Sequence, residues 1–297
     1  MQHKLPQITG RFAPTPSGPL HFGSLVSAVA SYCHVRSNGG QWLLRIEDVD
    51  TPRVVKGASE HILHTLQAFG FEWDGPVIYQ SRRFPLYEEI LQHLISQKYL
   101  YRCSCSRKQL NKQNLELGPL GRIYPGSCRN LNLRNPTLSL RLNVESAGTV
   151  DFIDAHYGNV ELNLPDQVGD VVLKRVDGVY AYHLAVVIDD HEQRVNQIVR
   201  GSDLLKVSTL HHYLYRLLAY PVPEYLHIPV VNSASGEKLS KQTGAKGLVI
   251  DKASIQLADA AHYLGQEIPR QLTSARPYEI LQYMIQHWNP LKIPAAN

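Results

Sequence analysis

The first part of the chain alternates between short apolar runs and longer stretches with helical periodicity. Residues 8–13 and 42–46 are short apolar runs that predict two strands. Apolar residues recur at three- and four-residue steps from residue 25 until the Asn-Gly-Gly at 38–40, and again over 59–69, which predicts a helix after each strand. This strand–helix–strand–helix order favours a βαβ unit and a parallel sheet.

Further along the chain the same patterns recur on either side of an irregular segment. Residues 84–98 and 207–218 have helical periodicity. Between about 101 and 135, Cys, Gly, Pro, Asn and Arg dominate, so we expect an insertion outside the main sheet. Asp177 and Gly178, between two apolar runs, are typical of a hairpin turn. The remaining predicted strands are 138–142, 150–153, 171–175 and 227–231, with short helices after 250.

The composition is that of an ordinary globular protein. The 297 residues are 43% hydrophobic and 19% charged, enough for a sizeable core in one or two domains. The net charge of +4 is compatible with a nucleic-acid partner without requiring one. We find no apolar run as long as a membrane span and no signal peptide at the start. We therefore expect a cytoplasmic protein with no membrane partner and, since nothing indicates an extended interaction surface, a monomer.

Residues 11–24, Arg-Phe-Ala-Pro-Thr-Pro-Ser-Gly-Pro-Leu-His-Phe-Gly-Ser, place a Pro/Gly-rich turn between the first predicted strand and helix. A helix N-terminus presents unpaired N–H groups and partial positive charge, which suits a phosphate. Gly18 and Gly23 would let a nucleotide approach the backbone closely. His21 could donate to a phosphate. A lone histidine in such a loop is more often an ordinary surface residue, so the interpretation depends on the whole segment.

A second basic segment, Lys238-Leu-Ser-Lys-Gln, follows the predicted strand 227–231. Lys238 and Lys241, on a small polar loop, can close over a triphosphate and stabilise charge on a leaving pyrophosphate. A lysine-rich string alone is usually just solvated. Its position after a strand, and far downstream of residues 11–24, favours a functional interpretation.

Three of the four cysteines are Cys103, Cys105 and Cys128. Three thiolates and one further donor would give zinc its tetrahedral coordination. The alternative is a set of reduced cysteines without a metal. We favour zinc, in a structural role, because no catalytic residue type is nearby in sequence. Cys33 continues the apolar face of the first predicted helix and is expected in the core.

Together and in this order, the two segments resemble the signature motifs of class I aminoacyl-tRNA synthetases. Residues 11–24 are similar to the glutamyl branch of that class, and the resemblance covers about residues 8–250. Three further segments fit the same pattern: 45–50 (Arg-Ile-Glu-Asp-Val-Asp), 180–190 and 198–203 (Ile-Val-Arg-Gly-Ser-Asp). The resemblance implies an α/β fold with a Rossmann-like, parallel-sheet catalytic domain.

The resemblance also implies a division of the chain. Residues 1–100 and 171–250 would form the two halves of the catalytic domain, 101–170 an inserted zinc-containing, acceptor-type subdomain, and 251–297 a short helical C-terminal region. Because the chain ends soon after the second segment, we expect no anticodon-binding domain. This shortened form with its Cys-x-Cys is similar to the glutamyl-queuosine tRNA(Asp) synthetase family.

That family implies ATP-dependent activation of L-glutamate, with magnesium, to glutamyl-adenylate. Glutamate then passes to queuosine, a modified base in the anticodon loop of tRNA(Asp). An enzyme that brings this loop to its catalytic site needs no distant domain to read the anticodon. The alternative in the same branch is a minimal glutamyl-tRNA synthetase that charges the 3′ end of tRNA(Glu). A non-catalytic RNA-binding paralogue and a generic nucleotidyl transferase explain fewer of the matching residues.

The resemblance finally implies roles for individual residues. The glutamate site would contain Arg11, Phe12, Ala13, Pro14, Thr15, Glu47, Tyr182 and Arg200, with arginines for the carboxylates and Glu47 for the ammonium. ATP would contact His21, Gly23, Ser24 and Lys241, and the catalytic residues would be His21, Lys238 and Lys241. Zinc would bind Cys103, Cys105, Cys128 and Tyr124. Ser24 and Gln242 depart from the family's usual motifs, and each departure removes a phosphate donor.

Overall fold

The computed structural model describes residues 7–232 and 246–295. Its main feature is a seven-stranded sheet in the order β3-β2-β1-β11-β12-β8-β9. All neighbouring strands pair in parallel except β8 and β9, so the predicted parallel sheet is confirmed, with one antiparallel edge. The strands are β1 (Thr9–Phe12), β2 (Gln41–Ile46), β3 (Ile78–Tyr79), β8 (Thr149–Asp154), β9 (Gly158–Asn163), β11 (Gln197–Gly201) and β12 (Glu224–Ile228).

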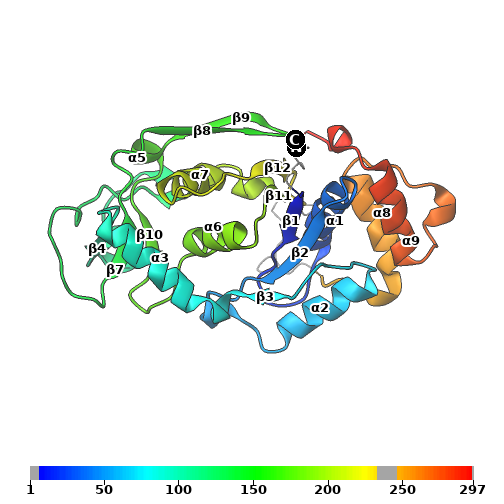
Figure 1. Ribbon diagram of the computed structural model, residues 1–297, viewed down its shortest axis with the longest axis horizontal. Coiled ribbons are helices and arrows are strands. Elements are labelled where there is room, and N and C mark those ends of the chain that lie inside the picture. The colour runs from blue at the N-terminus through cyan, green and yellow to red at the C-terminus, as the bar shows by residue number, and fades with distance from the viewer. Residues whose placement is uncertain (1–6, 233–245, 296–297) are drawn as a thin grey trace, which may run out of the picture.

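Helices cover both faces of this sheet (Figure 1). On one face lie α1 (Phe22–Arg36), α2 (Ala58–Ala68), α8 (Ala253–Tyr263) and α9 (Pro277–His287), which share one hydrophobic core with β1 and β2. On the other lie α6 (Tyr182–Glu192) and α7 (Val207–Leu217). Gly10 lets α1 approach β1 closely, because a Cβ there would lie 2.3 Å from Val35 Cγ2. Among the described helices, none combines the length and apolar character that crossing a membrane requires.

A smaller antiparallel sheet, β10-β7-β4, lies at the far end of α6 and α7 and shares a second core with them and with α3 (Figure 1). Its surroundings contain the irregular segment, which lies outside the main sheet as expected. The elements are α3 (Phe84–Ser96), β4 (Leu100–Cys103), α4 (Arg107–Lys112), β5 (Leu117–Gly118), β6 (Gly121–Arg122), β7 (Ser139–Leu142), α5 (Leu164–Gln167) and β10 (Val171–Lys174). The domain boundaries stay a prediction; β8 and β9, from the range 101–170, extend the main sheet.

One predicted strand differs from the structure in its bounds. The strand expected over 227–231 is β12, which begins earlier and ends at Ile228, immediately before Pro229, whose nitrogen cannot donate to a ladder. Gly178 does occupy a turn, with a φ of 84°. Lys174 and Tyr180 pair across this turn in an antiparallel bridge, so the predicted hairpin turn is confirmed, and the apolar run that follows forms α6. A short apolar run does not distinguish a buried strand from a buried helix.

Candidate active site

A cavity of about 640 Å³ lies at the carboxyl ends of β1, β2, β11 and β12. This is where ligands bind in open α/β sheets, because loops diverge there. The structure brings all the described residues predicted for glutamate and ATP into its lining: Arg11, Phe12, Ala13, Pro14, Thr15, His21, Gly23, Ser24, Glu47, Tyr182 and Arg200. Lys238, Lys241 and Gln242 lie outside the described residues, so their predicted roles stay predictions.

Arg200, on β11, is buried at one side of the cavity among neutral partners. Its Nη1 donates to the Tyr182 hydroxyl at 3.1 Å, and its Nη2 donates to Ser208 Oγ at 2.7 Å. Nη2 also donates to His211 Nδ1 at 3.3 Å, and Nε donates to His227 Nε2 at 3.2 Å. Within the described part of the chain, Arg200 forms no ion pair, so this buried cation has room for an anionic ligand.

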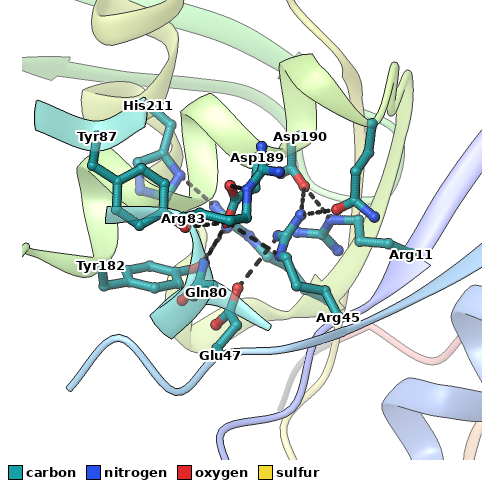
Figure 2. Close-up of polar contacts among 12 residues, drawn as sticks. Arg11, Arg45, Glu47, Gln80, Arg83, Tyr87, Tyr182, Asp189, Asp190 and His211 are labelled. Carbon is teal, nitrogen blue, oxygen red and sulfur yellow. Dashed lines mark hydrogen bonds and ion pairs between the residues drawn. The ribbon is translucent and has the colours of Figure 1, made fainter. Parts of the chain in front are cut away.

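Glu47 lies at another side of the cavity, where β2 has just ended, and belongs to a buried charge network (Figure 2). Arg45 Nη2 donates to Glu47 Oε1 at 3.3 Å, and Arg45 Nη1 donates to Asp190 Oδ1 at 2.8 Å. Arg11 Nε donates to the same Asp190 oxygen at 3.0 Å. Burial raises the pKa of Glu47, although Arg45 and Arg11 oppose the shift. An ammonium group bound here would stabilise the carboxylate further.

Asp189 extends this network away from the cavity. Its two oxygens accept hydrogen bonds from Arg83 Nε at 2.6 Å, Gln80 Nε2 at 2.8 Å and the Tyr87 hydroxyl at 2.8 Å. Because Asp189 and Asp190 are adjacent on α6, the bonds fix both the helix and the arginines that face it (Figure 2). The network therefore positions Arg11 and Glu47 without occupying the cavity.

The N-terminus of α1 lines the cavity through His21 and Ser24. His21 is the N-cap, and its Nδ1 accepts a hydrogen bond from the Ser24 backbone nitrogen at 3.2 Å. The neutral ring therefore carries its proton on Nε2, which is a donor. Residues on both sides of the undescribed segment 233–245 also reach this place: Val231 lines the cavity, and Gly247 forms a β-bridge with His21.

The three predicted cysteine ligands come together outside the cavity, with their sulfurs within 4.8 Å of one another. The Tyr124 hydroxyl lies 3.4 Å from Cys103 Sγ and 3.4 Å from Cys105 Sγ. Burial alone would raise the pKa of Cys128, but hydrogen bonds from Tyr124 and Ser104 outweigh it and lower the pKa to about 6. Burial raises the pKa of Cys105 to about 11, so the fit to a metal ion rests on the gathering of three sulfurs and one oxygen, the donor number of a tetrahedral site.

Sequence reasoning gave no role to Arg45, Asp189, Asp190, His211 or His227. Their partners are far away in the chain; Arg45 and Asp190 are 145 residues apart. One signal was available. Two adjacent aspartates directly after an apolar run are costly to bury unless cations face them, so Asp189 and Asp190 indicated buried arginine partners.

Comparison with known proteins agrees with this geometry. Residues 7–261 match the family model of the catalytic domain of class I tRNA synthetases (E and Q). The chain is similar to the glutamyl-Q tRNA(Asp) synthetase of Dechloromonas aromatica, with 48% identity over 96% of this chain and 95% of that one. The protein of the same name from Neisseria meningitidis is 46% identical, over 96% and 97% of the two chains.

A solved structure supports the fold. A glutamate tRNA ligase from Elizabethkingia meningosepticum, crystallised with its amino acid, superposes with a TM-score of 0.81. The match covers 98% of this chain but 66% of the ligase, at 24% identity. At that identity the similarity establishes the class of fold alone.

Proposed function

The chain belongs to the glutamyl-Q tRNA(Asp) synthetases, a family of class I tRNA synthetases, and we propose that it attaches L-glutamate to queuosine in tRNA(Asp) after activating it with ATP. The observation that carries the proposal is Arg200, a buried cation at the cavity whose hydrogen-bond partners are all neutral. A substrate carboxylate supplies the missing counter-charge.

Glutamate fits the distribution of charge in the cavity. One carboxylate binds Arg200 and the Tyr182 hydroxyl, which accepts from Arg200 and so keeps its own hydrogen for a ligand. The ammonium binds Glu47. Arg11 uses Nε for Asp190, and among the described residues its two Nη atoms have no protein acceptor, which suits the second carboxylate. A neutral amino acid would leave one arginine uncompensated.

ATP then lies with its phosphates at the N-terminus of α1, where backbone N–H groups and His21 donate. The α-carboxylate oxygen attacks the α-phosphorus, the bond to the bridging oxygen breaks, and pyrophosphate leaves. Lys238 and Lys241 stabilise that charge. Val231, before their segment, lines the cavity, and Gly247, after it, pairs with His21 of the cavity lining. Magnesium, bound by ATP, neutralises phosphate charge. A queuosine hydroxyl then attacks the glutamyl carbonyl, the bond from that carbon to the phosphate oxygen breaks, and AMP leaves while the hydroxyl proton is released to solvent. Positioning and electrostatics account for the rate.

The test is transfer of labelled glutamate, with ATP, to three purified RNAs. We expect label on tRNA(Asp) that carries queuosine and none on tRNA(Asp) lacking it or on tRNA(Glu). Label on the 3′ end of tRNA(Glu) would instead identify a minimal glutamyl-tRNA synthetase. A Lys241→Ala variant should slow glutamate-dependent pyrophosphate exchange much more than it weakens glutamate binding. Unchanged exchange in this variant would remove Lys241 from the mechanism.

We assign zinc to the cysteine cluster, with Cys103, Cys105 and Cys128 as ligands and Tyr124 as the fourth. The tyrosine hydroxyl lies 3.4 Å from each of two of the sulfurs. The site is structural, since the four side chains form a cluster separate from the cavity lining. We expect the enzyme to be a monomer. We also expect it to act in the cytoplasm, where its tRNA substrate is.

A further inference from the structure

We propose that Asp154 and His227 are positioning residues that hold Arg200 in the orientation needed to bind a substrate carboxylate, through a buried chain Asp154–His227–Arg200. The inference rests on the proposed function, because it concerns the same carboxylate. Neither residue lines the cavity. Each side chain is buried, and each lies on a strand of the main sheet, β8 for Asp154 and β12 for His227.

Asp154 is fixed by four N–H donors. Its Oδ1 accepts from the backbone nitrogens of His156 at 3.0 Å and Tyr157 at 2.9 Å. Its Oδ2 accepts from the His227 backbone nitrogen at 3.1 Å and from the ring at Nδ1, 2.6 Å away. Both oxygens therefore face donors only. A side chain with an NH₂ group in place of either oxygen would set two donors against each other.

The contacts determine the tautomer of His227. An arginine Nε can only donate, so the His227 Nε2 that lies 3.2 Å from it is an acceptor, and the ring proton is on Nδ1, facing Asp154. Burial lowers the pKa of His227 to about 4, against the opposing effect of Asp154, so the ring is neutral at pH 7. An ionised Asp154 thus favours the one tautomer that can accept from Arg200.

The hydrogen bonds around Arg200 leave one of its donors for a ligand. Of the five N–H groups of a guanidinium, Nε–H goes to His227, both on Nη2 go to Ser208 and His211, and one on Nη1 goes to Tyr182. Among the described residues the second N–H of Nη1 has no acceptor, and it lies next to the tyrosine hydroxyl. Without the acceptor at His227, the guanidinium loses one of the four hydrogen bonds that orient its plane, and this donor pair is held less firmly.

The first experiment determines which ring nitrogen of His227 carries the proton, and it requires no substrate. Long-range ¹H–¹⁵N spectra of the ¹⁵N-histidine-labelled protein at pH 7, with His227→Gln used for assignment, should show His227 protonated at Nδ1 and unprotonated at Nε2. A proton on Nε2 would overturn the proposal whether or not the enzyme uses glutamate.

The second experiment compares the effect of a substitution on the KM for glutamate with its effect on the KM for ATP. His227→Phe keeps the buried ring and removes the acceptor, so the glutamate KM should rise about 10- to 100-fold, the range of a lost hydrogen bond to a charged group, while the ATP KM stays within about twofold. His227→Gln can still present an acceptor and should recover most of the loss. His212→Phe is the matched control, since His212 is also buried, on α7, and is not among the hydrogen-bond partners of Arg200 in the described part of the chain.

Asp154→Asn should raise the glutamate KM as well, and combined with His227→Phe it should add little, because both act through Arg200. Thermal melting confirms that each variant is folded. A folded His227→Phe enzyme with the wild-type glutamate KM would refute the proposed positioning of Arg200 by Asp154 and His227. A wild-type enzyme that neither binds nor transfers glutamate would refute the proposed function instead, and the tautomer would still be measured.

Discussion

Arg45 and Asp190 form an ion pair inside the molecule, with Nη1 and Oδ1 2.8 Å apart and side chains 0% and 1% exposed. The same Asp190 oxygen accepts from Arg11, and the same guanidinium donates to Glu47. The pair therefore joins two residues of the cavity lining through groups that do not line it. Its energetic value lies less in the attraction itself than in what either charge would cost without the other.

Arg45→Met should therefore lower the free energy of unfolding by about 3–5 kcal/mol, because it leaves Asp190 and Glu47 buried with less compensating charge. Urea unfolding measures the change. Arg175→Met is the matched control: Arg175 pairs with Asp177 on the surface, and its loss should cost less than about 1 kcal/mol. Equal effects of the two substitutions would contradict a special role for the buried pair.

Buried histidines should make the protein sensitive to mild acid. Burial lowers the pKa of His183, His212 and His227 to about 4, against about 6.5 in an unfolded chain. Between these values the unfolded state binds more protons, so stability that is fully present above pH 6.5 is lost as the pH falls toward 4. By pH 5 each histidine should lower the free energy of unfolding by up to about 2 kcal/mol.

Urea unfolding at pH 7.5, 6 and 5 tests this, with substitutions that remove one group at a time. His183→Asn should flatten the dependence of stability on pH. His64→Asn, at an exposed position on α2, should leave the dependence unchanged. If both variants followed the wild-type curve, the buried histidines would not be the source of the acid sensitivity.

The sequence was sufficient for the parts of the site that are local in the chain. Residues 11–24 predicted a strand, a turn and a helix N-terminus, and the structure has them as β1, a loop and α1. It was insufficient where the chemistry depends on distant strands meeting. Asp154 and His227 become neighbours only because β8 pairs with β12, and nothing in the pattern of either strand fixes that order. The helix α6 was not predicted, because a short apolar run does not by itself distinguish a buried helix from a buried strand.

Removing a cysteine ligand should remove the metal. Cys105→Ser is expected to abolish zinc binding, since a neutral hydroxyl replaces a thiolate, and Tyr124→Phe to weaken it. Cys33→Ala should keep one zinc ion per chain, because Cys33 lies on α1 and is buried in the main core. Metal analysis of proteins purified without chelator gives the stoichiometry. Zinc retained in Cys105→Ser at the wild-type level would exclude this ligand set.

Tyr182→Phe should weaken the binding of glutamate without slowing the chemical step. The Tyr182 hydroxyl accepts from Arg200 Nη1 and keeps its own hydrogen for the carboxylate, so its removal costs one hydrogen bond to a charged group and leaves a guanidinium N–H unpaired. We expect the glutamate KM to rise about 10- to 100-fold with kcat nearly unchanged, because the contact is equally strong in the ground and transition states. Tyr180→Phe, two residues away and bonded to Glu88, should leave the glutamate KM as in the wild type. A fall in kcat at constant KM would instead mean that the tyrosine acts on the developing charge of the reaction, and that glutamate is held by Arg200 and Arg11 alone.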